Sequence, residues 1–137
     1  MLSHQQTAFA ADARLAHLAT TDANGQPHVV PITFVLMDGA LYFAVDEKPK
    51  RTKHLKRLRN IEENPSVALV IDRYDEDWSK LGWLMVQGEA TVIDNTGVRE
   101  LVVRALREKY GQYRDMPLAG PLVKIVPSKV LGWGDIS

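Results

Sequence analysis

Short apolar runs separated by turn residues fill the first third of the chain. These runs cover residues 15–21, 28–36 and 40–45. The second turn contains Asp38-Gly39, and this dipeptide between apolar runs favours a type I′ hairpin because both residues tolerate a positive φ. We therefore expect three antiparallel strands in succession, joined by tight turns.

Three other segments carry the apolar spacing or the capping residues of helices. They are a short helix after Ser3, which forms a capping-box pattern with Gln6, a helix over 52–63 that ends at Asn64-Pro65, and a helix from Asn95 or Thr96 to Tyr110-Gly111. Further apolar runs at 66–71, 83–93 and 122–133 predict three more strands. Gly88 indicates a bulge or bend in the second of these, and Pro127 a break or bend in the third.

Six mostly antiparallel strands with two or three helices predict a mainly β fold, a small barrel with helices packed outside it. The first 46 residues show no alternation of strands and helices, which argues against a doubly wound parallel sheet. Residues 112–121 are expected to form a loop. So is the acidic run at 72–77, in which paired carboxylates more often form a solvated face than an acid/base pair.

Composition narrows the functional classes. The 137 residues are 45% hydrophobic and 25% charged, which suits one domain over 1–137. With no cysteine, disulfides, iron–sulfur clusters and thiol nucleophiles are excluded. There is no apolar stretch long enough to span a membrane, and the N-terminus lacks the features of a secretory signal. We expect a cytoplasmic protein without a membrane partner.

Several catalytic motifs are missing from the sequence. The four histidines form no HExxH pair, so we expect no metal site. The glycines form neither a dinucleotide-binding fingerprint nor a P-loop, and no serine lies in a GxSxG turn. Nucleotide-triphosphate chemistry and serine hydrolysis are therefore not expected.

The basic residues are concentrated in one segment. Residues 48–59 contain seven of the 17 lysines and arginines and no acid, so the rest of the chain, with ten bases and 17 acids, has a net charge of −7. Basic side chains surround the start of the predicted helix and Glu62-Glu63 its end, the reverse of what the helix dipole favours. A phosphate or carboxylate held near Thr52 would compensate. The alternative is a solvated basic face in which Lys56 and Arg57 pair with nearby acids.

This basic segment follows directly on the apolar run that ends at Val45. An anion held there would let the rest of its molecule extend along the neighbouring strand. The aromatic candidates to cover a flat ring are Phe34, Tyr42, Phe43, Trp78 and Trp83. Most aromatic residues belong to cores, but Trp78 follows three acidic residues and is not expected to be wholly buried.

Four segments covering most of the chain resemble a known family. They are LAHLATTDANGQPHVVPITFVL at 15–36, LYFAVDEKPKRTKHLKRLRNIEENPSVALVID at 41–72, DEDWSKLGWLMVQGEATV at 75–92 and VLGW at 130–133. In these segments the sequence resembles the flavin-binding split-barrel proteins related to pyridoxamine 5′-phosphate oxidase, and most closely their branch that uses the deazaflavin coenzyme F-420. The resemblance implies a six-stranded antiparallel split barrel with flanking helices. It also implies a homodimer that binds two cofactors in grooves at the interface.

The resemblance also implies cofactor-binding residues. Lys50, Arg51, Thr52 and Lys53 match the family's phosphate-binding segment. Pro31, Ile32 and Thr33 match the strand whose backbone lies against the flavin-like ring, and Trp78 and Trp83 match positions near the groove, donated by either subunit. The chain ends VLGWGDIS and lacks the C-terminal Arg and His motif that holds vitamin B6 substrates. It also lacks the Arg-x-x-Leu-Lys pattern for FMN, while its many cations suit the longer anionic tail of F-420.

The resulting hypothesis is an F-420-dependent oxidoreductase, a reductase that transfers a hydride between the cofactor and an unidentified small organic substrate. The cofactor supplies the reactive chemistry. No catalytic residue is assigned, because Tyr42, His28 and a bound water are equal candidates for the proton donor. The alternatives are an FMN-binding flavoprotein of the same fold and a non-catalytic flavin- or haem-binding module. Nucleic-acid binding through 48–59 is not expected, since only His54 supplies an interleaved ring.

Overall fold

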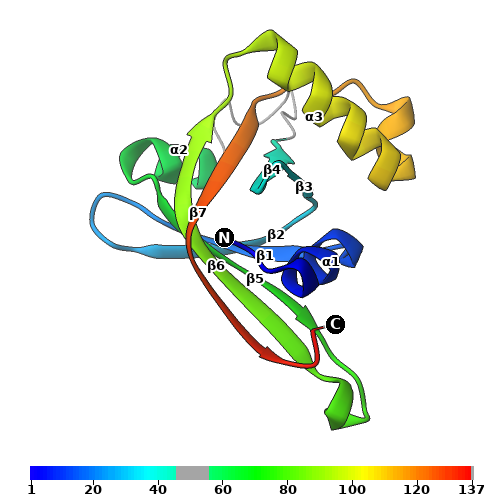
Figure 1. Ribbon diagram of the computed structural model, residues 1–137. Helices are drawn as coiled ribbons and strands as arrows, with labels where there is room; N and C mark the ends of the chain where they lie inside the picture. The colour runs from blue at the N-terminus through cyan, green and yellow to red at the C-terminus, as the bar shows by residue number, and fades with distance from the viewer. Residues whose placement is uncertain (46–55, 137) are drawn as a thin grey trace.

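The computed structural model describes residues 1–45 and 56–136 of the chain, and these form a curled antiparallel sheet with helices around it (Figure 1). The strands are β1 (Ala16–Thr21), β2 (Pro27–Ile32), β3 (Val35–Met37), β4 (Ala40–Ala44), β5 (Ser66–Arg73), β6 (Gly82–Val92) and β7 (Leu122–Gly134). The helices are α1 (His4–Asp12), α2 (Lys56–Glu63), α3 (Thr96–Lys109) and the 3-10 helices η1 (Trp78–Lys80) and η2 (Gly111–Asp115). No helix in these ranges has the length and apolarity needed to cross a membrane.

The order of strands in the sheet explains its curvature. The seven strands lie in the order β2-β1-β5-β6-β7-β4-β3, and every neighbouring pair is antiparallel. The two edge strands, β2 and β3, follow one another in the chain and are separated only by Thr33 and Phe34. Because two residues cannot span a flat sheet of seven strands, the sheet must curl until its edges approach. The predicted mainly β split-barrel class is confirmed.

The strand count differs from the expected six. We expected one strand over residues 28–36, but the structure divides this run into β2 and β3 at Thr33-Phe34. The division arises because β2 pairs with β1, while β3 pairs with β4 at the other edge of the sheet. The apolar pattern continues across the division, so it contains no sign that the chain changes partners there.

The core fills the inside of the curl and extends beneath α1 and α2. One cluster packs Phe9 of α1 and Leu58 of α2 against inward-facing residues of the strands, among them Leu18, Leu69 and Leu84. A second, smaller cluster packs the apolar side of α3 against β3, β4 and the start of β7. In Figure 1, α3 accordingly lies next to β3 and β4, and η1 lies at the far end of the long β5–β6 hairpin.

Local turn chemistry agrees with the sequence at three positions. Asp38 and Gly39 both have positive φ, 52° and 78°, as a type I′ turn requires. Pairing between β6 and β7 shifts register between Gln87 and Gly88, so the bulge predicted at Gly88 is present. A Cβ at Gly88 would lie 2.2 Å from the Val126 carbonyl oxygen, so only glycine fits there. The bulge absorbs the irregularity at Pro127, and β7 continues through it instead of breaking.

The predicted helices are present where the structure describes them, and two segments predicted as loops contain regular structure. Ser3 and Gln6 form the expected capping box, and Asn95 caps α3, which ends at Lys109 before Tyr110. Residues 112–121 are not entirely loop, because η2 occupies their first part. The acidic run predicted as loop begins inside β5, which extends to Arg73. The predicted helix over 52–63 is described from Lys56 onward, and its first residues lie outside the described part of the chain.

Candidate functional site

The end of β2 presents three residues of different accessibility. Pro31 is exposed on the outer face of the sheet, whereas Ile32 as a whole residue is 5% exposed and belongs to the core. Ile32 is paired with Ala16 of β1. Proline is compatible with this position because β2 is an edge strand, where a missing N–H leaves no ladder bond broken. Thr33 follows the strand, and its Oγ1 lies 2.7 Å from the Tyr113 hydroxyl oxygen.

Side chains from the end of α3 hold the chain where β2 gives way to β3. The Phe34 N–H donates to the Tyr110 hydroxyl oxygen (3.2 Å), and that hydroxyl donates in turn to the Phe34 carbonyl and to the Arg14 carbonyl. The Lys109 ammonium donates to the Phe34 carbonyl at 3.0 Å and lies 4.0 Å from the centre of the Phe34 ring. Both backbone polar groups of Phe34 are thus satisfied without a strand partner.

These surroundings change the acidity of two side chains. Burial lowers the pKa of Lys109 to about 8, with a smaller lowering from the nearby Arg14 guanidinium and a partial opposing effect from Asp12. Burial also raises the pKa of the Tyr110 hydroxyl. Lys109 therefore changes its charge within about a pH unit of neutrality, whereas Tyr110 stays neutral.

The outer face of the sheet carries an apolar row in register across five strands. Pro31, His17, Val70, Met85 and Leu131 lie directly opposite one another on successive strands. Leu131 is 41% exposed, and Trp133 two residues further along β7 is 53% exposed. We call this row together with Trp83 and Trp133 the outer apolar face. His17 is the one polar residue of the row, and Val70 and Met85 are half-buried.

The two predicted groove tryptophans occupy different positions. Trp83 lies at the start of β6 on the outer apolar face, opposite Asp72 and Trp133. Three strand spacings separate β6 from β2, so Trp83 and Pro31 share one face at roughly 15 Å. Trp78 is in η1, is 70% exposed, and donates from its ring nitrogen to the Tyr74 hydroxyl at 3.4 Å. The expectation that Trp78 is not a core residue is confirmed.

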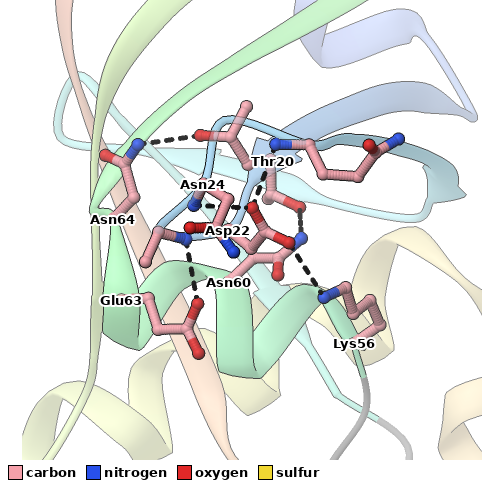
Figure 2. Close-up of polar contacts among 10 residues, drawn as sticks. Thr20, Asp22, Asn24, Lys56, Asn60, Glu63 and Asn64 are labelled. Carbon is pink, nitrogen blue, oxygen red and sulfur yellow. Dashed lines mark hydrogen bonds and ion pairs between the residues drawn. The ribbon is translucent and has the colours of Figure 1, made fainter.

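Helix α2 is held against the β1–β2 turn by a set of polar contacts that we call the α2 clamp (Figure 2). Lys56, Asn60 and Glu63 of α2 take part at the spacing of one helical face, together with Asn64, which directly follows the helix. Lys56 Nζ lies 3.6 Å from an Asp22 carboxylate oxygen, and Glu63 accepts from the Ala23 N–H at 3.0 Å. Asn64 donates to Thr21 and Asn60 donates to Thr20.

The α2 clamp accounts for part of the reversed charge pattern. Glu63, placed unfavourably at the helix C-terminus, accepts a backbone N–H of the turn instead. Lys56 pairs with Asp22, as the solvated-face alternative predicted. The pKa of Asp22 is lowered most by the Gln26 N–H; burial opposes this, and the Asn24 N–H and Lys56 lower the pKa further. The clamp does not test the predicted anion site, because its residues lie outside the described part of the chain. They are Lys50, Arg51, Thr52 and Lys53.

Asn60 is the least accessible polar residue of the clamp. It is 0% exposed, and its Nδ2 donates at 3.0 Å to the Thr20 hydroxyl, which is 1% exposed. Within the described residues, Asn60 Oδ1 has no hydrogen-bond partner. Loss of the hydrogen bond between Asn60 and Thr20 would leave further buried polar groups unpaired, which is costly.

Sequence reasoning missed the side chains that surround Thr33. Lys109, Tyr110 and Tyr113 were interpreted as the end of a helix and the start of a loop, and Arg14 was not considered. Their contacts join residues about 75 to 96 positions apart, such as Lys109 with Phe34 and Tyr110 with Arg14. No local pattern indicates such pairing. The one available signal was a lysine and two tyrosines clustered at a helix end.

Within 1–45 and 56–136, no group of three or more histidines, aspartates or glutamates is arranged to hold a metal ion.

The chain was also compared with known proteins. The model of the pyridoxamine 5′-phosphate oxidase family matches residues 2–134. A conserved hypothetical protein from Mycobacterium tuberculosis has a TM-score of 0.78 at 21% identity, covering 98% of this chain and 86% of that one. The haem storage protein HutZ from Vibrio cholerae has a TM-score of 0.73 at 18% identity, covering 90% and 89%. An FAD-binding protein from Mesorhizobium loti has a TM-score of 0.70 at 22% identity, covering 96% and 92%.

No curated protein matches the chain significantly. The structural likenesses fall below 25% identity and define the fold: a split barrel shared by proteins described as FAD-binding and as haem-storing. The family match covers nearly the whole chain, and the protein belongs to the pyridoxamine 5′-phosphate oxidase family.

Proposed function

We propose that this protein is an F-420-dependent oxidoreductase that acts as a homodimer in the cytoplasm and reduces a small organic substrate. The observation that carries the proposal is the junction at the end of β2. There an edge strand with an exposed Pro31 meets the hydroxyl of Thr33, beside the outer apolar face. Membership of a flavin-binding family supports a flat ring as the occupant of this junction.

The outer apolar face supports the homodimer. Its exposed Leu131, Trp83 and Trp133 are of the residue types that interface cores contain, and they lie together on one side of the sheet. A second copy packed on this face would cover them and would bring a second set of tryptophans toward each β2. Trp78 and Trp83 are then groove residues supplied by one subunit or the other.

The basic segment supports an anionic cofactor tail. Lys50, Arg51, Thr52 and Lys53 directly precede α2, and the α2 clamp fixes the first described residue of that helix, Lys56, to Asp22. Backbone N–H groups and cations at the start of a helix favour a phosphate. The surplus of cations over what one phosphate needs favours F-420, with its longer anionic tail, over FMN.

The residues of the chain bind and orient, and the deazaflavin supplies the hydride when it is bound. Pro31, Ile32 and Thr33 fix one edge of the ring through the backbone of β2. The tryptophans and the second subunit exclude water from it. Lys50, Arg51 and Lys53 hold the charged tail, so that the reactive part of the ring keeps one position relative to the substrate.

The test is a titration of the purified protein with F-420 and, separately, with FMN, followed by cofactor fluorescence at moderate salt. Arg51→Ala and Lys53→Ala should each weaken F-420 binding by about tenfold or more, since each removes a charge-assisted contact worth roughly 1.5–3 kcal/mol. Lys80→Ala removes an exposed lysine of η1 and serves as the matched control, with unchanged affinity expected. Binding of neither cofactor would refute the proposal.

Titration also distinguishes two alternative functions. Binding of FMN alone would make the protein an FMN-dependent flavoprotein of the same family. A haem-binding module is favoured by one observation, the exposed His17 in the middle of the outer apolar face, where an imidazole is available to a flat apolar ligand. A Soret shift on adding haemin that is abolished by His17→Ala, with no flavin or deazaflavin binding, would establish that function instead.

A further inference from the structure

The junction at Thr33 contains hydrogen-bond donors that the fold does not use. Lys109 has three N–H donors, and one of them reaches the Phe34 carbonyl at 3.0 Å. Thr33 and Tyr113 have two O–H hydrogens between them and share one hydrogen bond of 2.7 Å. Two N–H bonds and one O–H bond are therefore left for another molecule within the described part of the chain.

Tyr110, the third polar group at this junction, has a different role. Its oxygen accepts from the Phe34 N–H, and its single O–H is directed at the carbonyls of Phe34 and Arg14. Tyr110 is thus fully engaged by the backbone and is a structural residue. Tyr110 therefore holds the junction together, whereas Lys109 and the Thr33–Tyr113 pair keep donors for another molecule.

Lys109 is also held firmly in place. The Arg14 guanidinium donates to the Lys109 carbonyl at 2.9 Å and stacks over the Tyr110 ring at 4.7 Å. The Lys109 ammonium lies over the Phe34 ring, and no carboxylate in residues 1–45 or 56–136 forms an ion pair with it. Two cations, Arg14 and Lys109, therefore share one site, with Asp12 as an acidic neighbour, and that site favours an oxygen that carries negative charge.

We propose that Lys109, together with the Thr33–Tyr113 hydroxyl pair, binds the carbonyl-type oxygen of the substrate and donates the proton that completes its reduction. This inference rests on the proposed function, because it places the substrate beside a ring bound at β2. It assigns the proton donor that sequence reasoning left open among Tyr42, His28 and water. Tyr42 is 4% exposed and faces the second core cluster, which leaves it without access to a substrate.

The chemistry balances with these groups. Hydride transfer brings two electrons and a hydrogen to a carbon of the substrate, and the electron pair of its double bond moves to the oxygen as a negative charge. The ammonium of Lys109 stabilises that charge by a charge-assisted hydrogen bond. One N–H bond of Lys109 then breaks, the proton goes to the substrate, and the neutral amine regains a proton from water.

The titration behaviour of Lys109 suits this role. A general acid works best with a pKa near the working pH, and burial brings Lys109 to about 8, so it is charged at neutral pH and gives up its proton readily. The other charged groups facing it are Arg14, which lowers its pKa further, and Asp12, which raises it. The Tyr110 ring also faces it, with its centre 5.3 Å from the Lys109 ammonium, and burial raises the pKa of the Tyr110 hydroxyl.

The test uses 4-nitrophenolate as a stable mimic of the anionic oxygen, added to the protein saturated with whichever cofactor the wild type binds. Its affinity is measured by quenching of cofactor fluorescence, and the reactivity of Lys109 toward acetic anhydride is followed by peptide mass spectrometry. We expect Lys109→Met to weaken 4-nitrophenolate by about tenfold or more and Tyr113→Phe by a few-fold. Cofactor affinity should stay unchanged in both, and Lys80→Met should change nothing.

Two further results sharpen the test. In the wild type, 4-nitrophenolate should protect Lys109 from acetylation, and its affinity should fall as the pH rises through about 8, whereas Lys109→Met should show neither effect. If Lys109→Met also loses the cofactor, Lys109→Arg decides: restored phenolate binding supports the inference, and continued loss overturns it.

Failure of the inference is distinguishable from failure of the proposed function. Cofactor binding with equal phenolate affinity in wild type and Lys109→Met would overturn the inference and leave the proposed function intact. A wild-type protein that binds neither F-420 nor FMN would overturn both.

Discussion

The two faces of the same sheet differ in what covers them. The inner row Val30, Leu18, Leu69, Val86 and Val130 lies next to the outer row Pro31, His17, Val70, Met85 and Leu131, each row in register across the same five strands. The inner row packs into the main core. The outer row has no covering element in the described chain, although four of its five residues, all except His17, are apolar.

This difference separates the apolar residues that fold the monomer from those that the proposed homodimer would use. Alternation of apolar and polar residues is the usual mark of a strand with one solvated face. Here the strands are apolar on both faces near the middle of the sheet. The inner residues contribute to the free energy of folding, and the outer ones would be buried in the homodimer that we propose.

The largest effect should come from truncating the inner row. Leu69→Ala removes a side chain that is 1% exposed and should lower the free energy of unfolding by about 2–5 kcal/mol, because it leaves a cavity in the core. Urea denaturation measures this. The matched control is the next residue, Val70→Ala on the outer row, for which we expect less than about 1 kcal/mol under monomeric conditions. Equal losses would mean that the two faces do not differ.

A charge on the outer row should break the proposed homodimer. Leu131→Asp places an unpaired carboxylate at the interface and should raise the dimer dissociation constant by at least about a hundredfold, since burying an unpaired charge costs several kcal/mol. Sedimentation velocity over a concentration series measures it. Leu101→Asp on the exposed side of α3 is the control, since Leu101 is 50% exposed but lies away from the outer apolar face. A wild-type monomer at all concentrations would contradict this assignment.

The buried hydrogen bond between Asn60 and Thr20 of β1 gives a smaller and more specific effect. Asn60→Ala leaves the buried Thr20 hydroxyl without its partner and should destabilise the protein by about 1–3 kcal/mol. Asn64→Ala, which removes the more accessible contact to Thr21, should cost less than about 1 kcal/mol. Thermal unfolding of the two variants, measured side by side, tests whether burial sets the difference.

The last effect concerns Lys109 and depends on pH. Its pKa is lowered from 10.5 to about 8 in the folded protein, so between these values the unfolded chain binds more protons and stability rises with pH. At neutral pH the charged, half-buried ammonium destabilises the fold, and Lys109→Met should then be the more stable protein. That advantage should shrink as the pH rises from about 8 toward 10. A difference between the two proteins that does not vary with pH would contradict this.

Most of the fold is encoded locally enough to be predicted. Asp38-Gly39, Gly88 and the Ser3–Gln6 capping box each specify a local conformation, and all three predictions are confirmed. The exchange of partners at Thr33-Phe34 was not predictable, because it depends on which strands pair across the sheet.

The candidate site shows the same division between local and distant information. Pro31, Ile32 and Thr33 were found through a family resemblance, which preserves the order of elements along the chain. Tyr113 contacts Thr33 from 80 residues away and Lys109 contacts the neighbouring Phe34 from 75 residues away, so only the folded structure reveals them. Lys50, Arg51, Thr52 and Lys53 remain predictions from charge and family alone.

The two sheet edges also bear on how the protein avoids aggregation. An exposed edge strand offers unpaired backbone groups to any other chain, and proteins limit this hazard with short edges and prolines. β3 is three residues long, and β2 contains Pro27 and Pro31, so neither edge is a good template for an added strand. Growth into fibres through strand addition is therefore disfavoured, which leaves the face of the sheet, and not its edges, as the surface for the homodimer that we propose.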